Sequence, residues 1–248
     1  MAWDNKELHE KFEPLLRCLE EGSSVALLTM RGSCCPVTRA HCDMFQLARS
    51  VLLGQSLLCP PGTPPFSECL GLLALNPDRS IKRKFERRSE SENPIRWFDR
   101  AHLIRLATAE VPWLVLNNLE AKEAVQELEE DTRWQHLKFV HFHLNGADDV
   151  ARWEKWKHAS ASQRYITIGR REWTEKVLEG AREYGVLDTP HFHVTAELPD
   201  ISATAVRTAL RCQDRDALDR MLHPSVAAWC LRNRIYSSTP AVEKAQLR

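Results

Sequence analysis

Short apolar runs alternate with segments of helical periodicity along most of this 248-residue chain. The first run, residues 24–30, has the character of a parallel strand covered on both faces. Further runs predict strands at 113–116, 138–144, 164–168 and 191–196. Apolar spacing predicts helices at 38–53, 96–108, 119–130, 149–158 and 171–184, with three more towards the C-terminal end. This alternation predicts an α/β fold, a doubly wound parallel sheet with a helical C-terminal tail over its carboxyl edge.

Three segments fall outside the alternating pattern. Leucines and a phenylalanine at helical spacing before Gly22 predict an N-terminal helical extension over residues 1–23. Residues 59–95 open with four prolines and close with a basic run, and we expect a long mobile insertion there, because loops of this length are usually functional or disordered. Residues 24–236 would then form one domain, and residues 237–248 a disordered tail.

Composition excludes several classes of protein. The 34 basic and 34 acidic residues balance, so no global field favours a nucleic-acid or membrane partner. No apolar run approaches the ~20 residues that span a bilayer. The first residues are acidic, unlike a signal peptide, and the 8 cysteines contain no Cys-x-x-Cys pair. We therefore expect reduced thiols and a cytoplasmic or nuclear location.

Two segments far apart in the chain have the features of phosphate-binding sites. Residues 32–41 read Gly-Ser-Cys-Cys-Pro-Val-Thr-Arg-Ala-His and predict a small-residue turn leading into a helix. Residues 201–207 read Ile-Ser-Ala-Thr-Ala-Val-Arg and predict a helix start with two hydroxyls and a guanidinium one turn in. The N-terminus of a helix carries unpaired N–H groups and partial positive charge. Two such sites on one cleft would suit a nucleoside triphosphate.

These segments resemble the motifs G-S-F-x-P-x-T-x-x-H and I-S-S-T-x-I-R of nucleotidyltransferases that transfer an adenylyl group from ATP. Cys34, Ala203 and Val206 depart from those motifs. The run 146–148, Gly-Ala-Asp, the pair Trp-Lys at 156–157 and the closing helix 223–236 are similar to eukaryotic-type nicotinamide/nicotinate mononucleotide adenylyltransferases.

The resemblance covers residues from about 25 to 236 and implies a Rossmann-like nucleotidyltransferase fold. It also implies a reaction of ATP with nicotinamide mononucleotide, and with nicotinate mononucleotide, to give NAD or deamido-NAD and pyrophosphate. Mg²⁺ would be bound mainly through phosphate oxygens rather than by a protein cage.

The resemblance assigns roles to individual residues. His41 and Arg207 would be the catalytic donors to the phosphates, with both side chains facing an open cleft. ATP would be bound by Thr38, His41, Asp148, Ser202, Thr204, Ala205, Val206 and Arg207. The acceptor nucleotide would be bound by Gly32, Ser33, Gly146, Trp156 and Arg170. Trp156 would stack on the pyridine ring, and a lysine of the insertion, Lys82 or Lys84, would reach the β- and γ-phosphates.

Several alternatives stay open from the sequence. The acceptor could instead be another phosphorylated compound such as phosphopantetheine, or the chain could keep the fold without turnover. Two His-x-His pairs, at 141/143 and 191/193, would enclose a metal with Asp148 if their strands were neighbours. The basic run 81–88 fits a nuclear import signal or a solvated loop that attracts phosphate. Assembly into a homo-oligomer is also left open.

Overall fold

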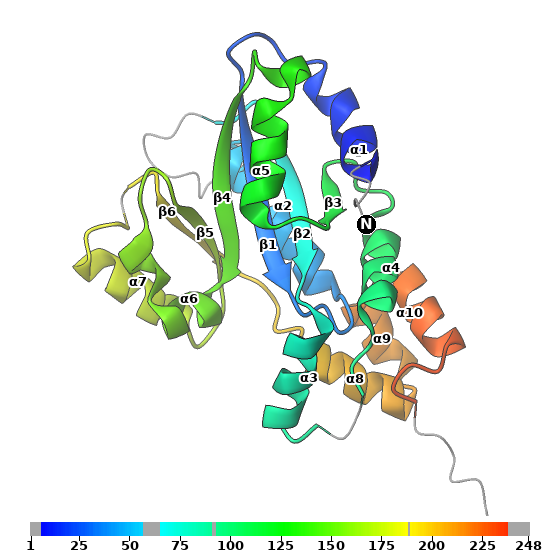
Figure 1. Cartoon of the computed structure of the whole chain (residues 1–248). Helices are drawn as coiled ribbons and strands as arrows, with labels where there is room; N and C mark the ends of the chain where they lie inside the picture. Colours follow the sequence, from blue (N-terminus) through cyan, green and yellow to red (C-terminus); the bar gives the residue numbers. More distant parts are fainter. Residues whose placement is uncertain (1–5, 57–64, 91–92, 188, 238–248) are drawn as a thin grey trace, which may run out of the picture.

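The computed structural model describes residues 6–56, 65–90, 93–187 and 189–237. Its core is one six-stranded parallel sheet with the strand order β3-β2-β1-β4-β5-β6 (Figure 1). The strands are β1 (Ser24–Gly32), β2 (Glu68–Leu75), β3 (Leu114–Asn117), β4 (Lys138–Gly146), β5 (Arg164–Gly169) and β6 (Phe192–Glu197). The strand order runs outwards in both directions from a reversal between β1 and β4. The expected doubly wound fold is therefore confirmed, and ligands of such sheets bind at the carboxyl ends beside the reversal.

Helices cover both faces of the sheet and its carboxyl edge. The longer ones are α1 (Lys6–Leu16), α2 (Arg39–Leu52), α3 (Asp78–Arg87), α4 (Trp97–Thr108), α5 (Ala121–Glu130), α7 (Thr174–Glu183), α8 (Ala203–Cys212) and α10 (Pro224–Arg232). Shorter ones are α6 (Ala147–Trp153), α9 (Arg215–Met221) and the 3₁₀ turns η1 (Thr132–Trp134) and η2 (Lys155–His158). Figure 1 shows α3, α8 and α9 beyond the carboxyl ends of the strands.

The expectation of an irregular insertion over 59–95 is wrong for the part of it that the structure describes. Residues 68–75 form β2, which lies between β1 and β3, and residues 78–87 form α3. The strand β2 was not predicted because it contains Gly71, and glycine is unfavourable in a strand interior. A Cβ at this glycine would lie 2.7 Å from Leu114 and 2.9 Å from Phe45, so the packing of α2 and β3 requires it.

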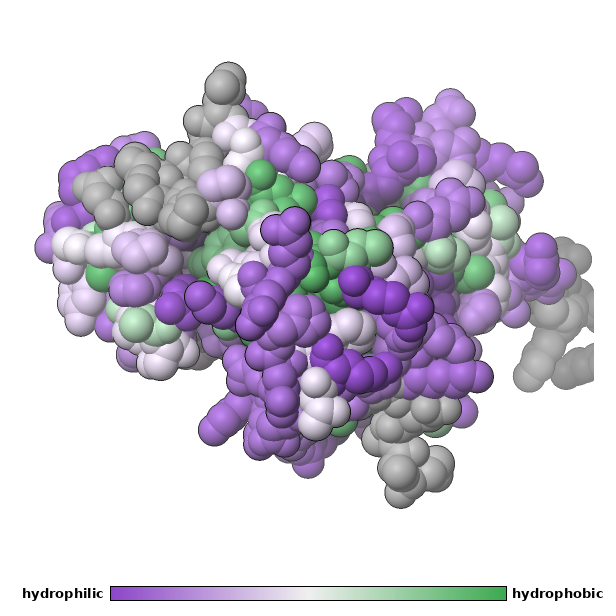
Figure 2. All heavy atoms as spheres, turned by 90° about the horizontal axis from the view of Figure 1, so that it is seen from above, coloured by the Kyte–Doolittle hydropathy of each residue, from purple (hydrophilic) through white to green (hydrophobic). Residues whose placement is uncertain are grey.

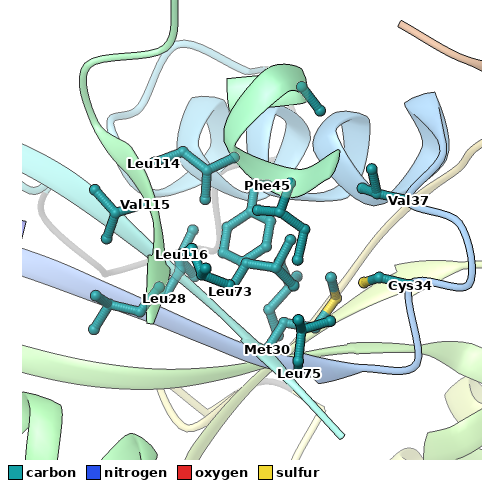
Figure 3. Close-up of a cluster of buried hydrophobic side chains, with 14 of the residues drawn as sticks. Leu28, Met30, Cys34, Val37, Phe45, Leu73, Leu75, Leu114, Val115 and Leu116 are labelled. Atoms are coloured by element: carbon teal, nitrogen blue, oxygen red, sulfur yellow. The ribbon is translucent and has the colours of Figure 1, made fainter. Parts of the chain in front are cut away.

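The main core fills the space between the sheet and α2. Leu28, Phe45 and Leu73 are wholly buried there, and Figure 3 shows them gathered under the helix. Cys34, which departs from the resemblance motif, lies at the edge of this cluster with 1% of its surface exposed. Burial raises the pKa of its thiol to about 12, so Cys34 packs as a small apolar residue and stays protonated.

The helical extension expected before β1 is present as α1 within the described residues. Leu8, Phe12 and Leu16 form its buried face, which packs against β2 and β3. Lys11 attaches α1 to the segment between α4 and β3. Its Nζ atom donates to the carbonyls of Thr108 at 2.7 Å, Leu114 at 3.1 Å and Val111. The ammonium thereby supplies partners to carbonyls at the C-terminal end of α4.

Trp156 lies in a second core on the opposite face of the sheet, with α6, α7 and η2. Only 4% of its surface is exposed, and it packs with Tyr165, Val177 and Phe192. A Cβ at Gly180 of α7 would lie 2.5 Å from the indole ring, so the ring fills the space beside this glycine. The prediction that Trp156 stacks on a ligand is therefore wrong, and the indole holds α7 against the sheet.

Figure 2 views the molecule from the end where the strands begin, opposite the carboxyl edge. Most of this face is hydrophilic, with apolar residues in a central band. None of the helices within the described residues is long and apolar enough to cross a bilayer.

Replacing Gly180 with alanine tests the packing of Trp156. Alanine favours a helix over glycine by about 1 kcal/mol, but overpacking a filled core costs about 1–3 kcal/mol. We expect Gly180→Ala to lower the free energy of unfolding in a urea titration. Glu179→Ala, one position earlier on the exposed side of α7, is the control and should change it by less than about 0.5 kcal/mol. A Gly180→Ala protein as stable as the parent would contradict this packing.

Candidate active site

A cleft opens at the carboxyl ends of β1, β4 and β5, beside the reversal of strand order. One part has a volume of about 350 Å³, and its lining includes Gly32, Ser33, His41, Gly146, Asp148 and Arg170. A second part of about 240 Å³ adjoins it at Ser33, His41, Lys84, Asp148, Arg170 and Ile201 and extends to Ser202, Thr204 and Arg207. The structure therefore brings both phosphate-type segments to one cleft, as the sequence predicts.

The loop after β1 is held by a buried guanidinium that the sequence analysis missed. Arg100 of α4 is wholly buried, and its Nη atoms donate to the carbonyls of Ser33 and Asn76, each at 2.9 Å. It also donates to the carbonyl of Ile95 at 3.1 Å and pairs with Asp78 at 2.6 Å. Arg100 shares the buried stripe of α4 with Leu103, Ile104 and Ala107, and a charged residue on such a stripe was the available signal.

His41 enters the cleft from the first turn of α2. Its Nδ1 atom accepts from the backbone N–H of Thr38 at 3.1 Å and lies 2.7 Å from the Thr38 hydroxyl. Because Nδ1 is the acceptor, the proton of the neutral ring is on Nε2, which is left to donate. Burial, and then the nearby Lys84 charge, lower the pKa of His41 to about 4. At pH 7 the imidazole is therefore a neutral donor.

Thr38 positions this ring and does not line the cleft. Only 2% of its surface is exposed, and its side chain borders a separate cavity between α2 and the end of α4. The prediction that Thr38 contacts ATP directly is corrected accordingly. A Thr-x-x-His spacing places the two side chains one helical turn apart, which lets the histidine take the place of the acidic residue in a capping box.

The start of α8 forms the other wall of the cleft. Ser202 caps this helix by accepting from the N–H of Ala205 at 3.1 Å, and its carbonyl accepts from the N–H of Val206. The N–H groups of Ala203 and Thr204 have no acceptor among the residues that the structure describes. They are the donors left for an anion, whereas the N–H groups of the predicted residues Ala205 and Val206 are occupied, and Val206 is wholly buried, so the prediction for it is corrected accordingly.

Arg207 borders the second part of the cleft, but it is nearly buried, with 4% of its surface exposed, and is not openly exposed there as expected. It donates to the carbonyl of Cys35 and to the hydroxyl of Thr204, each at 3.1 Å, and it pairs with Glu90. The Phe85 ring lies 4.7 Å from the guanidinium carbon. A carboxylate thus occupies the position at Arg207 where the resemblance places a phosphate, and no sequence pattern indicated Glu90.

The opposite side of the cleft carries one guanidinium between two carboxylates. Arg170 follows β5, and its guanidinium lies 3.3 Å from Asp148 and 2.9 Å from Asp200. A Cβ at Gly146 would lie 2.8 Å from the Asp148 carboxylate, so the glycine leaves room for that side chain. The predicted residues Gly146, Asp148 and Arg170 therefore lie together at the ends of β4 and β5.

The structure distinguishes the two candidate lysines. Lys84 lines both parts of the cleft, and its Nζ atom lies 3.4 Å from the Ser33 hydroxyl. Burial and the neighbouring Arg88 and Arg207 lower the pKa of its ammonium. Lys82 is on the exposed side of α3. Because Ile81 and Phe85 are the buried positions of this helix, the basic run 81–88 is the polar surface of a folded helix rather than of a loop.

The two His-x-His pairs do not meet. β5 separates β4 from β6, and the register pairs His143 with Tyr165 but His193 with Ile166. Since adjacent residues of β5 point to opposite faces, the two pairs point to opposite faces of the sheet. Within the described part of the chain, no three His, Cys, Asp or Glu side chains are grouped for a metal. The four-imidazole hypothesis is therefore wrong.

Comparison with known proteins shows the same fold at low sequence identity. Plasmodium falciparum nicotinic acid mononucleotide adenylyltransferase complexed with NaAD superposes with a TM-score of 0.53 and 15% identity, over 85% of this chain and 97% of that chain. The same enzyme complexed with APC gives 0.51 and 14%, over 86% and 97%. No protein-family model and no curated protein matches the sequence. At this identity the likeness shows the fold alone.

Lys84 and Lys82 offer a matched pair of variants. We expect Lys84→Met to weaken binding of ATP, measured by calorimetry, about 10-fold or more, because a charged hydrogen-bond donor is removed from the cleft. Lys82→Met should leave binding within about 2-fold, since an exposed charge contributes little. Equal losses in the two variants would show that only the net charge of α3 matters.

Proposed function

We propose that this protein transfers the adenylyl group of MgATP to a pyridine mononucleotide, nicotinamide or nicotinate mononucleotide, and releases pyrophosphate. The observation that carries the proposal is the meeting of His41, Lys84, Arg170 and the α8 start in one cleft. These donors come from distant parts of the chain, and they meet where a doubly wound sheet binds ligands. The neighbours with the same fold are named as adenylyltransferases of a pyridine mononucleotide.

The reaction needs positioned charge more than a protein nucleophile. A phosphate oxygen of the acceptor attacks the α-phosphorus of ATP, a new P–O bond forms, and the bond to the β-phosphate oxygen breaks with pyrophosphate as leaving group. Donors fixed beforehand on the phosphates lower the barrier because they require no reorganisation during the step. His41 Nε2 and Lys84 would be such donors, because Thr38 contacts the His41 ring and Ser33 contacts the Lys84 ammonium.

The ATP phosphates would lie along the start of α8. The unpaired N–H groups of Ala203 and Thr204 and the positive end of the helix suit the β- and γ-phosphates. Arg207 would join them after exchanging Glu90 for a phosphate oxygen, keeping its bond to the Cys35 carbonyl. The acceptor phosphate would lie beside Ser33 and Lys84, and the Lys84 ammonium would contact it together with the ATP phosphates.

Magnesium belongs to the substrate in this proposal. Among the described residues that line the cleft, Asp148 pairs with Arg170, Asp149 with Lys155 and Glu90 with Arg207. No cluster of three such ligands occurs among the described residues, so the lining fits an ion carried by phosphate oxygens, which is how Mg²⁺ commonly binds with nucleotides.

The test is product formation by the purified protein. With ATP, Mg²⁺ and either mononucleotide, we expect NAD or deamido-NAD, detected by chromatography, between pH 6 and 9. The nearest alternative is transfer to another phosphorylated acceptor, and phosphopantetheine tests it. A higher kcat/KM with phosphopantetheine than with either mononucleotide would overturn the proposed acceptor. ATP binding without turnover of any acceptor would instead show a non-catalytic protein, in which Glu90 stays on Arg207.

His41→Ala is expected to lower kcat about 100-fold or more, the scale of losing one donor aimed at developing charge. The KM for ATP should change much less, because the donor acts most strongly in the transition state. His136→Ala is the control: this histidine is exposed and precedes β4 at the opposite edge of the sheet. If His41→Ala instead unfolds the protein while the remaining folded molecules keep full kcat, His41 is a core residue.

A further inference from the structure

A third cavity continues from the cleft, between α3 and α6. Its volume is about 490 Å³, within the range of small-molecule sites. It shares Ser33, Asn76 and Lys84 with the first part of the cleft, and Ser33, Lys84 and Arg88 with the second part. A group bound next to Ser33 and Lys84 can therefore extend into it.

Cations from two elements line this cavity. Arg87 and Arg88 come from the end of α3, Arg152 comes from α6, and Lys84 stands at the junction with the cleft. None of the described residues that line it is acidic. Guanidinium groups gathered this way repel one another and create a positive potential inside the cavity.

These guanidinium groups are weakly paired within the protein. Arg152 makes no hydrogen bond or ion pair with any residue that the structure describes. The Nε atom of Arg87 lies 3.4 Å from the carbonyl of Arg83, and Arg88 lies 3.9 Å from Glu90. The described part of the chain thus leaves most of their donors unused, whereas Arg133 elsewhere on the surface lies 2.6 Å from Asp131.

We propose that Arg87, Arg88 and Arg152 form an anion-selecting subsite for the acceptor, at the end remote from its phosphate. This rests on the proposed function, which puts the acceptor phosphate beside Ser33 and Lys84. The preferred acceptor then carries a second anionic group that the guanidiniums bind, and a carboxylate matches their planar fork. Nicotinate mononucleotide has this carboxylate, whereas nicotinamide mononucleotide has a neutral amide in its place.

The experiment compares kcat/KM for the two mononucleotides in the same protein with saturating MgATP. We expect the wild-type protein to favour the nicotinate compound about 10-fold or more, the scale of a hydrogen bond to a charged group. Arg152→Gln and Arg87→Gln should each reduce this ratio several-fold, and Arg152→Lys should restore part of it. Arg83→Gln, an exposed change on α3 outside the cavity lining, is the control and should leave the ratio unchanged.

The other outcomes would overturn either the subsite alone or the proposed function as well. Equal losses for both mononucleotides in Arg152→Gln would mean that the cavity binds their common phosphate, and would overturn the subsite. A wild-type preference for the nicotinamide compound would overturn it as well. Product from both compounds at equal kcat/KM overturns only the subsite, whereas no product from either overturns the proposed function together with it. Thermal unfolding of each variant verifies that the exposed changes leave the fold intact.

Discussion

The buried guanidinium of Arg100 sets the geometry on which the cleft depends. It joins the carbonyl of Ser33 in the loop after β1, the carbonyl of Asn76 at the end of β2 and the carboxylate of Asp78 at the start of α3. Asp78 is half exposed, but Arg100 is wholly buried, and each buried carbonyl that loses its donor costs about 1–3 kcal/mol. Lys84 lies on α3, and Ser33 lies on the loop after β1. Arg100 contacts both segments and so holds the Lys84 Nζ atom 3.4 Å from the Ser33 hydroxyl.

Charges in the cleft are largely matched within the free protein. Glu90 occupies Arg207, and Asp148 and Asp200 occupy Arg170. Ligand phosphates would therefore replace these carboxylates as partners of the arginines. The guanidinium groups then have an anionic partner both in the free protein and in the complex, and the free energy cost of an unpaired buried cation is avoided. Lys84 and the first N–H groups of α8 make no such pair with the described residues, so they supply the new attraction.

Much of this arrangement was predictable, because strands buried on both faces and amphipathic helices leave strong local patterns. The sequence predicted five of the strands, the helix at α2 and the meeting of the two phosphate-type segments. The strand β2 was not predicted because Gly71 interrupts its apolar run. Glycine is required there because Leu114 and Phe45, which are distant in sequence, pack against this position. The resemblance assigned Trp156 a ligand contact, but burial against Gly180 is a tertiary property that a short motif does not encode.

The residues that complete the site were hidden for the same reason. Glu90 meets Arg207 across 117 positions of sequence, and Arg152 approaches α3 only because α6 follows β4 at the reversal of strand order. Lys84 and Lys82 lie in the same basic run, and the sequence did not distinguish them. The burial of Ile81 and Phe85 sets the orientation of α3, which places Lys84 at the cleft. Helix phase, strand order and long-range pairing therefore determine which charged residues form the site.

Following labelled phosphorus through the reaction tests the central claim most directly. The protein is incubated with MgATP labelled at the α-phosphate or at the γ-phosphate, together with a pyridine mononucleotide, and the products are separated. Adenylyl transfer predicts the α-label in the dinucleotide and the γ-label in pyrophosphate, in equal amounts. A γ-label in inorganic phosphate or on the mononucleotide, with no α-label in a dinucleotide, would contradict the account.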